Sequence, residues 1–354
     1  MNIVHVAPYG PNCAGIYEAA RDMVRADIQQ GHKAFFVDAG AQAVGSPTRN
    51  PCKVGAVDDR AGFSIITASP DVCNSADVIM LHTGCDNQWL VWNQAPVIMV
   101  VHGTPIAAFR VEQRGPQQSY SVYTVGAGWP RVKAMLYFWP EFRPYWDVVF
   151  PPEKSVVFDY PPIDQARFSS QGNGDEWEIP RFQRGQYNGL ICDSWREDSD
   201  ILEIVHGAME ASKRIQGLTW HIYAANQPLG PYEHIIKAMR SHGWLGTIAG
   251  RSPNMEQLYR SFDFVLSGRR SISRVIAEAL SCGTPVIADS GCTTASYVAD
   301  KESPTDIADA IQKLIGRLDN DREGLTQEAL TISKRFDLNA YGQAISKVYE
   351  RIVA

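Results

Sequence analysis

The chain has 354 residues, which is enough for two domains and too many for one ordinary hydrophobic core. Its 45% hydrophobic and 20% charged residues are typical of a globular protein, and the formal net charge of −6 argues against a strongly basic, non-specific nucleic-acid binder. Seven scattered cysteines without a C-x-x-C pair predict reduced thiols. The start NIVHVAP has no basic n-region and no apolar run reaches the length of a membrane span, so we expect a cytoplasmic protein.

In the first half of the chain, short apolar runs alternate with a helical pattern. Residues 14–31 have apolar side chains at helical spacing, and Gly31 is the expected C-cap. Residues 105–162 differ, because they are rich in proline and aromatic residues and lack a long helical pattern. We expect strands over residues 2–8, 32–40, 76–82 and 96–103. Continuous apolar strands that alternate with helices indicate a parallel sheet buried on both faces.

After a polar connector at residues 169–178, the same alternation begins again. We expect strands at residues 187–191, 218–225, 245–251, 263–268 and 284–291. We expect helices at residues 201–215, 232–244, 254–262, 274–283 and, as one amphipathic tail helix, 336–354. The sequence therefore predicts two doubly wound α/β domains with a cleft between them.

Ligands of open parallel sheets bind at the carboxyl ends of the strands, so the loops there should carry the chemistry. The loop from Gly10 to Gly15 opens a helix and could hold a phosphate, although an ordinary strand-to-helix turn explains it about as well. Later loops concentrate guanidinium groups, which repel one another unless an anion lies between them. These are Arg196, Arg251, Arg269, Arg270 and Arg274. We expect these cations, together with backbone amides and without a metal, to hold a diphosphate.

Several segments in order resemble GT-B-fold glycosyltransferases, most of all the retaining family 4 group. Residues 11–37 are similar to the glycine loop, first helix and second strand of that group. The segment PPEKSVVFDYPPID at residues 151–164 is similar to its linker entry, and AEALSCGTPVIADSG at residues 277–291 to its Glu-Ala…Gly-x-Pro-Val signature. The tail at residues 336–354 is similar to its last helix, which crosses back onto the first domain.

This resemblance implies two Rossmann-like domains that face each other across a cleft. Residues 1–165 would bind the acceptor, residues 166–335 would bind a nucleotide sugar, and residues 336–354 would pack back on the first domain. It implies an enzyme that transfers a hexose from a nucleoside diphosphate sugar, with a UDP-sugar favoured, with retention and without a metal or other cofactor. No integral membrane association is expected.

The resemblance also assigns roles to individual residues. Glu278 matches a carboxylate that binds the ribose hydroxyls, Arg196 a phosphate-binding arginine, and His102 a histidine that faces the donor sugar. His102 and Arg196 are the expected catalytic residues. A core or capping role is the alternative for His102, and for His82 a structural role is as good an interpretation as a functional one. The expected donor-binding residues are Gly15, Arg196, Arg251, Arg270, Ser273, Arg274 and Glu278.

Three positions depart from the family pattern. Arg270 stands where the family has its first Glu, Ser273 where it has a Gly, and Ile201 where it has a phosphate-binding Lys. A rebuilt phosphate clamp, with Arg270 or Arg274 in place of that Lys, is the expected consequence. The identity of the sugar is therefore left open.

The same departures resemble bacteriophage DNA glucosyltransferases, which share the fold and modify hydroxymethylated bases. Residues 105–150 contain five basic and three acidic side chains, and Trp129, Trp139 and Trp146 offer stacking faces. We therefore expect an acceptor site that includes Arg110, Arg114, Trp129 and Arg143. A modified base in DNA is one candidate acceptor, and a glycan, a lipid or a small molecule is the alternative; the aromatic residues would equally suit packing in a core. The alternatives to a transferase are a sugar-nucleotide epimerase and an inactive sugar-nucleotide-binding module.

Overall fold

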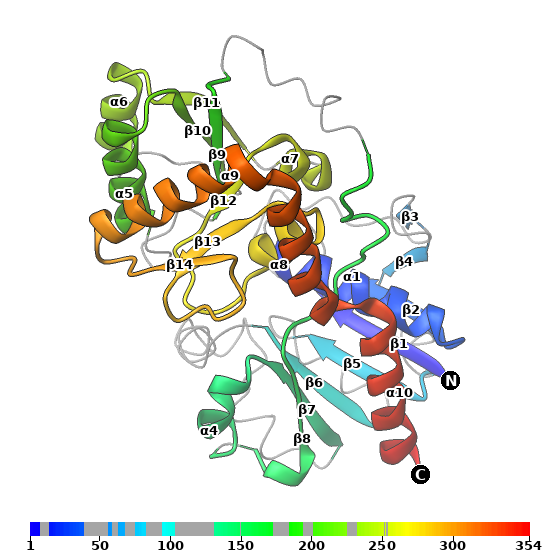
Figure 1. Ribbon diagram of the computed structural model, residues 1–354. Coiled ribbons are helices and arrows are strands. Elements are labelled where there is room, and N and C mark those ends of the chain that lie inside the picture. Colours follow the sequence, from blue (N-terminus) through cyan, green and yellow to red (C-terminus); the bar gives the residue numbers. More distant parts are fainter. Residues whose placement is uncertain are drawn as a thin grey trace. The chain divides into compact units, whose positions relative to one another are not determined.

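The chain forms two compact units in the computed structural model (Figure 1). The first consists of residues 1–164 and 336–354, and the second of residues 165–335. The structure describes residues 1–7, 14–38, 56–58, 63–67, 75–82, 94–102, 131–148, 150–172, 184–193, 201–224, 232–250, 252 and 254–354. Within these ranges, no helix is long and apolar enough to cross a membrane.

An eight-stranded sheet forms the first unit, with the described strands in the order β3-β4-β2-β1-β5-β6-β7-β8. All neighbouring pairs are parallel except β3 with β4. The strands are β1 (Asn2–Ala7), β2 (Lys33–Asp38), β3 (Ala56–Asp58), β4 (Phe63–Thr67), β5 (Val78–His82), β6 (Val97–Val101), β7 (Val132–Phe138) and β8 (Ser155–Phe158).

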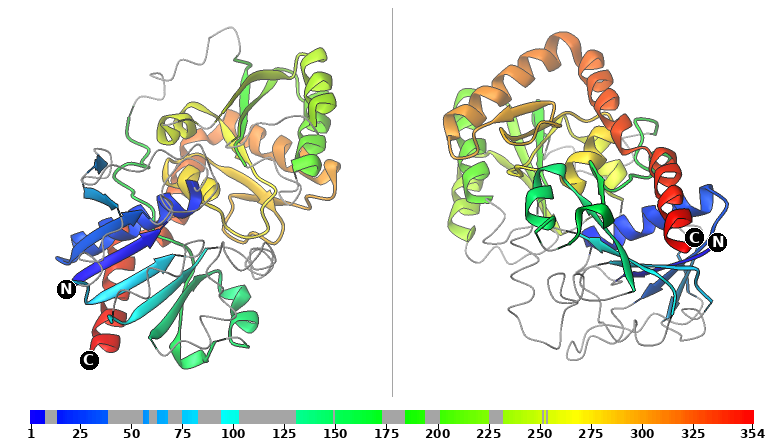
Figure 2. Two further views of the ribbon diagram at one scale, coloured as in Figure 1. Left: turned by 180° about the vertical axis from the view of Figure 1, so that it is seen from behind. Right: turned by 90° about the horizontal axis from the view of Figure 1, so that it is seen from below.

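Two helices from opposite ends of the chain cover one face of this sheet. Helix α1 (Ala14–Gln29) and helix α10 (Leu338–Val353) lie side by side in both views of Figure 2. Gly342 of α10 lies so close to α1 that an added Cβ atom would be 3.0 Å from the carbonyl oxygen of Ala26. Gly31, with φ of 81°, ends α1 in the left-handed conformation that its predicted role as C-cap requires.

Alternate residues of the buried strands divide into two cores. The side chains that meet α1 and α10 include Ile3, Val78, Met80, Ile98 and Val100. Those on the opposite face include Val4, Val6, Ile79, Leu81 and Met99. The short helix α4 (Arg143–Trp146) contributes Trp146, which is 0% exposed, to this second core. Trp146 is therefore a core residue, and its predicted role as an acceptor-stacking surface was wrong.

A wholly parallel six-stranded sheet, in the order β11-β10-β9-β12-β13-β14, forms the second unit. Its strands are β9 (Tyr187–Ile191), β10 (Leu218–Ala224), β11 (Leu245–Gly250), β12 (Phe264–Leu266), β13 (Val286–Asp289) and β14 (Tyr297–Ala299). Its helices are α5 (Ile201–Arg214), α6 (Glu233–Ser241), α7 (Met255–Ser261), α8 (Arg274–Ser281) and α9 (Pro304–Ser333).

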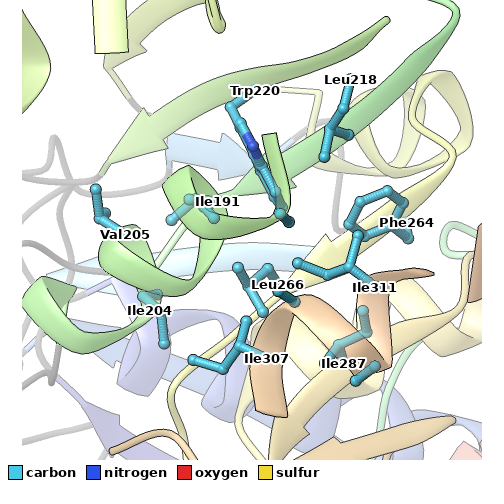
Figure 3. Close-up of a cluster of buried hydrophobic side chains, with 14 of the residues drawn as sticks. Ile191, Ile204, Val205, Leu218, Trp220, Phe264, Leu266, Ile287, Ile307 and Ile311 are labelled. Atoms are coloured by element: carbon cyan, nitrogen blue, oxygen red, sulfur yellow. The ribbon is translucent and has the colours of Figure 1, made fainter. Parts of the chain in front are cut away.

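Figure 3 shows the hydrophobic core between this sheet and helices α5 and α9. Trp220 of β10 and Phe264 of β12 meet edge to face, with their ring centroids 5.5 Å apart. The indole N–H of Trp220 donates a hydrogen bond to the hydroxyl of Ser212 on α5, 3.0 Å away, so this buried polar group has a partner. Ile307 of α9 packs directly against Gly207 of α5. A Cβ atom added at Gly207 would lie only 2.5 Å from Cγ2 of Ile307, so a larger residue does not fit there without a shift.

The predicted fold class is confirmed, since both units are doubly wound α/β structures whose sheets are parallel apart from the β3–β4 pair. Several parts of the fold were not predicted from the sequence, among them strands β3, β4 and β14 and the short helix α4. Strands β7 and β8 lie within the aromatic, proline-rich segment in which no regular element was expected, and β7 is nearly all buried. Helix α9, which spans 30 residues with a kink at Asp321 where φ is −154° and ψ is 55°, was not predicted either.

Candidate functional site

Each sheet reverses its strand order at one point. From the middle outward, the order of both is that of the doubly wound fold, with the switch between β1 and β5 in the first unit and between β9 and β12 in the second. Ligands bind at such switch points, outside the carboxyl ends of the strands. Polar side chains lie at the switch point of each sheet.

In the first unit, three histidines and an aspartate form a line of hydrogen bonds across the switch point. Nε2 of His5 is 2.7 Å from Oδ2 of Asp27, and Nδ1 of His5 is 3.1 Å from Nε2 of His82. Nδ1 of His82 is in turn 2.7 Å from Nε2 of His102. At the other end, the hydroxyl of Tyr349 donates to the carboxylate of Asp27, at 3.1–3.2 Å. We call these five residues the histidine chain.

Strand register explains why the histidines meet. His5 of β1 lies opposite Met80 of β5, and His82 stands two residues further along β5. His82 in turn lies opposite Val100 of β6, and His102 stands two residues further along. Because side chains two residues apart share a face, the three imidazoles form a diagonal on the face that α1 and α10 cover. The last of them, His102, is at the carboxyl edge of the sheet.

Burial sets the charge state of the inner members of the chain. His5, Asp27, His82 and Tyr349 are 0% exposed, whereas His102 is partly exposed. Burial, together with the neighbouring His102 and His5, lowers the pKa of His82 well below its ordinary value, so His82 stays neutral. Burial and the carboxylate of Asp27 raise the pKa of Tyr349, so its phenol keeps its proton.

In the second unit, Asp193 follows β9 and Ser267 follows β12, on the two sides of the switch point. The hydroxyl of Ser267 donates to Oδ2 of Asp193 at 2.6 Å, and Nε of Arg269 lies 3.8 Å from Oδ1 of the same carboxylate. Asp193 is only 3% exposed. The sequence prediction missed this carboxylate, although its place directly after a buried strand was the available signal.

Helix α8 begins next to this edge of the sheet. Its N-cap, Ser273, accepts a hydrogen bond from the backbone N–H of Ile276. One turn into the helix, Nε and Nη2 of Arg274 both lie 2.8 Å from Oε1 of Glu278. The hydroxyl of Tyr259 on α7 donates to the other carboxylate oxygen, Oε2, at 3.2 Å. Glu278, which is 6% exposed, is therefore held by protein groups on both of its oxygens.

Arg270 differs from Arg274 in its surroundings. Its side chain is 64% exposed; Nη2 lies 3.1 Å from Oε1 of Glu302 and Nε 3.6 Å from Oδ1 of Asp289 at the end of β13. Gly291 donates its backbone N–H to the same Oδ1 atom at 2.9 Å. Arg270 is thus the more accessible of the two guanidinium groups to a ligand anion.

The remaining predicted residues lie apart from these two groups or outside the described residues. Gly15 is the second residue of α1, and among the described residues no neighbouring side chain or other element comes within 4 Å of where its Cβ would be. Arg143 of α4 is 55% exposed and pairs with Asp147 one turn later, at 3.2 Å. Trp139 packs against Phe142 and other aromatic rings of the first unit. Outside the described residues lie Arg110, Arg114, Trp129, Arg196 and Arg251.

No group of three or more His, Cys, Asp or Glu side chains in the described parts of the chain is arranged to hold a metal ion. Metal independence stays a prediction. Both ring nitrogens of His5 and of His82, and Nε2 of His102, take part in hydrogen bonds within the histidine chain, whose chemistry is that of proton donors and acceptors.

No known protein-family model matches the chain, and a search of the curated proteins finds no match. Solved structures do match, over nearly the full length. A glycosyltransferase from Rickettsia africae is 13% identical with a TM-score of 0.70, covering 99% of this chain and 98% of the other. Anabaena HepE, in complex with UDP and glucose, is 13% identical with a TM-score of 0.71, covering 99% and 100%.

A third match is an α-glucosyltransferase in complex with UDP and a 13-mer DNA that contains an HMU base. It is 11% identical with a TM-score of 0.69, and the alignment covers 99% of both chains. At such low identity these likenesses speak for architecture. Together with two doubly wound units and a last helix that belongs to the first, they show that this chain has the GT-B fold.

Proposed function

We propose that the protein is a glycosyltransferase that moves a hexose from a nucleoside diphosphate sugar, with a UDP-hexose favoured, to an acceptor hydroxyl. The observation that carries this proposal is the match along 99% of the chain to a structure that holds UDP and glucose. Polar and cationic side chains at the carboxyl edge of the second sheet support it, because a diphosphate needs such partners.

In the proposed reaction, the bond between the anomeric carbon and the diphosphate oxygen breaks, and the acceptor oxygen forms a bond to the same carbon with retention. The acceptor hydroxyl passes its proton to an oxygen of the departing diphosphate or to solvent, and the nucleoside diphosphate leaves as an anion. Arg196 and Arg270 would stabilise that anion, together with the N-terminus of α8, without a metal. His102 would contact the sugar. Glu278 would hold the ribose, in exchange for part of its present bonding with Arg274 and Tyr259.

A thermal-shift series with UDP-, GDP- and ADP-glucose tests the donor. A ligand that binds only the folded state raises the melting temperature by mass action, by about 2.7 kcal/mol of stability at a hundredfold excess over Kd. We expect the UDP-sugar to give the largest shift, and slow release of UDP from it without acceptor. If no nucleotide sugar shifts the melting temperature, the proposal is wrong; binding without any release of UDP would indicate a binding module.

A modified base in DNA is a second proposal, for the acceptor. It is favoured by the match to the α-glucosyltransferase that was solved with UDP and an HMU-containing DNA. Duplex oligonucleotides with and without hydroxymethylated pyrimidines, offered with UDP-glucose, test it directly by mass spectrometry. DNA binding should also weaken with salt, with a log–log slope of about −0.9 per phosphate contacted. A flat salt dependence, or transfer only to glycans, would rule out DNA.

A further inference from the structure

The hydroxyl of Tyr259 connects the carboxylate of Glu278 to the carboxyl end of the second sheet. It donates a hydrogen bond to Oε2 of Glu278 at 3.2 Å, and a second hydrogen bond links it to the thiol of Cys192. Cys192 follows β9 directly and precedes Asp193, at the switch point of this sheet. One phenol on α7 therefore holds Glu278 next to the edge at which ligands of doubly wound sheets bind.

The surroundings of Tyr259 keep its side chain in one place. The residue is 0% exposed, its ring centroid lies 6.4 Å from that of Phe168, and its carbonyl oxygen accepts a hydrogen bond from the hydroxyl of Thr284 at 2.8 Å. Burial, together with the neighbouring Cys192 and Glu278, raises the pKa of Tyr259 well above its ordinary value. The phenol therefore keeps the proton that it donates to the carboxylate.

The two oxygens of Glu278 have different surroundings. Oε2 is bonded to the fully buried Tyr259, whereas Oε1 is paired with Arg274, whose side chain is 11% exposed. Arg274 is the first residue of α8, and α8 begins at the carboxyl edge of the sheet. Oε1 is therefore the oxygen on the side from which a ligand approaches, and a ligand hydroxyl can take the place of Arg274 there while Tyr259 stays bonded to Oε2.

We propose that Tyr259 is a positioning residue for the ribose of the donor: it holds Oε2 of Glu278 in place while Oε1 exchanges Arg274 for the ribose hydroxyls. A carboxylate that is already fixed loses little side-chain freedom when the ribose binds. Without the phenol, both oxygens become available to the two-pronged guanidinium of Arg274, which withdraws the carboxylate from the ligand. The inference rests on the proposed function, in which Glu278 binds the ribose of a nucleotide sugar.

Tyr259→Phe removes the hydroxyl and keeps the ring that packs against Phe168. Calorimetry of the full-length protein with UDP and with 2′,3′-dideoxy-UDP, which lacks both ribose hydroxyls, measures the contribution of the ribose as the ratio of the two affinities. We expect Tyr259→Phe to weaken the binding of UDP about two- to tenfold, the scale of one hydrogen bond, and to leave the binding of 2′,3′-dideoxy-UDP unchanged. The preference of the wild type for UDP over the dideoxy compound should shrink by the same factor.

Tyr187→Phe is the matched control. Tyr187 also donates its hydroxyl to a carboxylate of the second unit, that of Asp319 at 2.9 Å. It is the first residue of β9, however, and so lies at the opposite, amino edge of the sheet. Its substitution should leave both affinities unchanged, whatever its effect on the melting temperature, which is measured for each variant.

Three results would overturn the proposal: an unchanged affinity of Tyr259→Phe for UDP, an equal loss for UDP and for the dideoxy compound, or a wild type that binds the two alike. In each of these cases the protein still binds UDP, and the proposed function stands. If the wild type binds none of UDP, GDP and ADP, the proposed function fails and the role of Tyr259 fails with it. If GDP or ADP is bound in place of UDP, the same comparison is made with that nucleotide and its 2′,3′-dideoxy form.

Discussion

Arg274 and Glu278 form an ion pair one helical turn apart, at 2.8 Å, with only 11% and 8% of their side chains exposed. The i,i+4 spacing brings them together on α8, and Tyr259 closes the other side of the carboxylate. A pair this deep depends on both partners, because a single buried charge without its counter-ion is costly.

Glu278→Ala should therefore lower the free energy of unfolding by about 3–5 kcal/mol, in addition to weakening nucleotide-sugar binding by about 1–3 kcal/mol. Urea denaturation and calorimetry measure the two effects. Glu210→Ala is the matched control, since Glu210 pairs with Arg214 at the same spacing on α5 but at the surface; a far smaller loss is expected there, because water screens an exposed ion pair. Equal losses in both variants would contradict the importance of burial, and unchanged donor affinity would remove Glu278 from the proposed site.

Arg270→Ala tests the accessible guanidinium of the second unit. Because this side chain is 64% exposed, its loss should change stability by no more than about 0.5 kcal/mol. Affinity for the nucleotide sugar should fall by about 1.5–3 kcal/mol, the range for a charged hydrogen bond. Arg214→Ala, at the last turn of α5, removes another surface arginine and should leave affinity unchanged. If Arg270→Ala changed the affinity for the nucleotide sugar as little as Arg214→Ala does, Arg270 would not bind the diphosphate.

Arg196 lies outside the described residues and is tested on its proposed role alone. Arg196→Ala should lower kcat/KM about tenfold to a thousandfold, as expected when a group that stabilises developing charge is removed. Steady-state kinetics with UDP-hexose, alongside a melting curve, separate the possibilities. A loss of thermal stability with intact kinetics would make Arg196 a structural residue.

Two glycines in helices should respond in opposite ways to a side chain. At Gly342 of α10 a Cβ atom would be 3.0 Å from the backbone oxygen of Ala26, so Gly342→Ala should destabilise the first unit by about 1–3 kcal/mol. Gly316 is exposed on α9, with nothing within 4 Å of its Cβ position, so Gly316→Ala should add about 0.5–1 kcal/mol. Chemical denaturation of both variants tests the pair; a stabilised Gly342→Ala would mean that α10 does not pack this closely.

Acid should destabilise the protein through His221, because burial, with a smaller effect of Arg184, lowers the pKa of its imidazole from 6.5 to about 4. The unfolded chain takes up the proton first, so this group's contribution is complete above pH 6.5 and falls as the pH drops toward 4, by about 1.4 kcal/mol per unit at most. Nδ1 of His221 already accepts from the backbone N–H of Thr247 at 3.2 Å, which leaves no room for a proton there. His221→Gln should flatten the unfolding free energy against pH over this interval; an unchanged slope would assign the acid sensitivity to other groups.

The sequence predicted the architecture because buried parallel strands and amphipathic helices leave local patterns. It did not reveal β7, whose apolar run VKAMLYF lies within a segment dominated by proline and aromatic residues. Nor did it reveal the histidine chain. His102 and His82 were visible as polar residues at the ends of apolar runs, but His5 lies inside a strand and its partner Asp27 on a helix. Their meeting depends on strand register and helix packing, which are long-range properties.

The first unit is discontinuous in the chain, since its hydrophobic core is completed by α10 and its buried Asp27 by Tyr349. During synthesis, residues 165–335 leave the ribosome before that helix does, so the second unit is complete while the first unit still lacks α10. Until α10 is synthesised, α1 alone can cover this face of the first sheet, and the apolar side chains that pack against α10 stay exposed. Truncation of the chain before Tyr349 would therefore destabilise the first unit, although the deleted residues lie at the other end of the chain. The apolar side chains left exposed would increase the dependence of the new protein on chaperones.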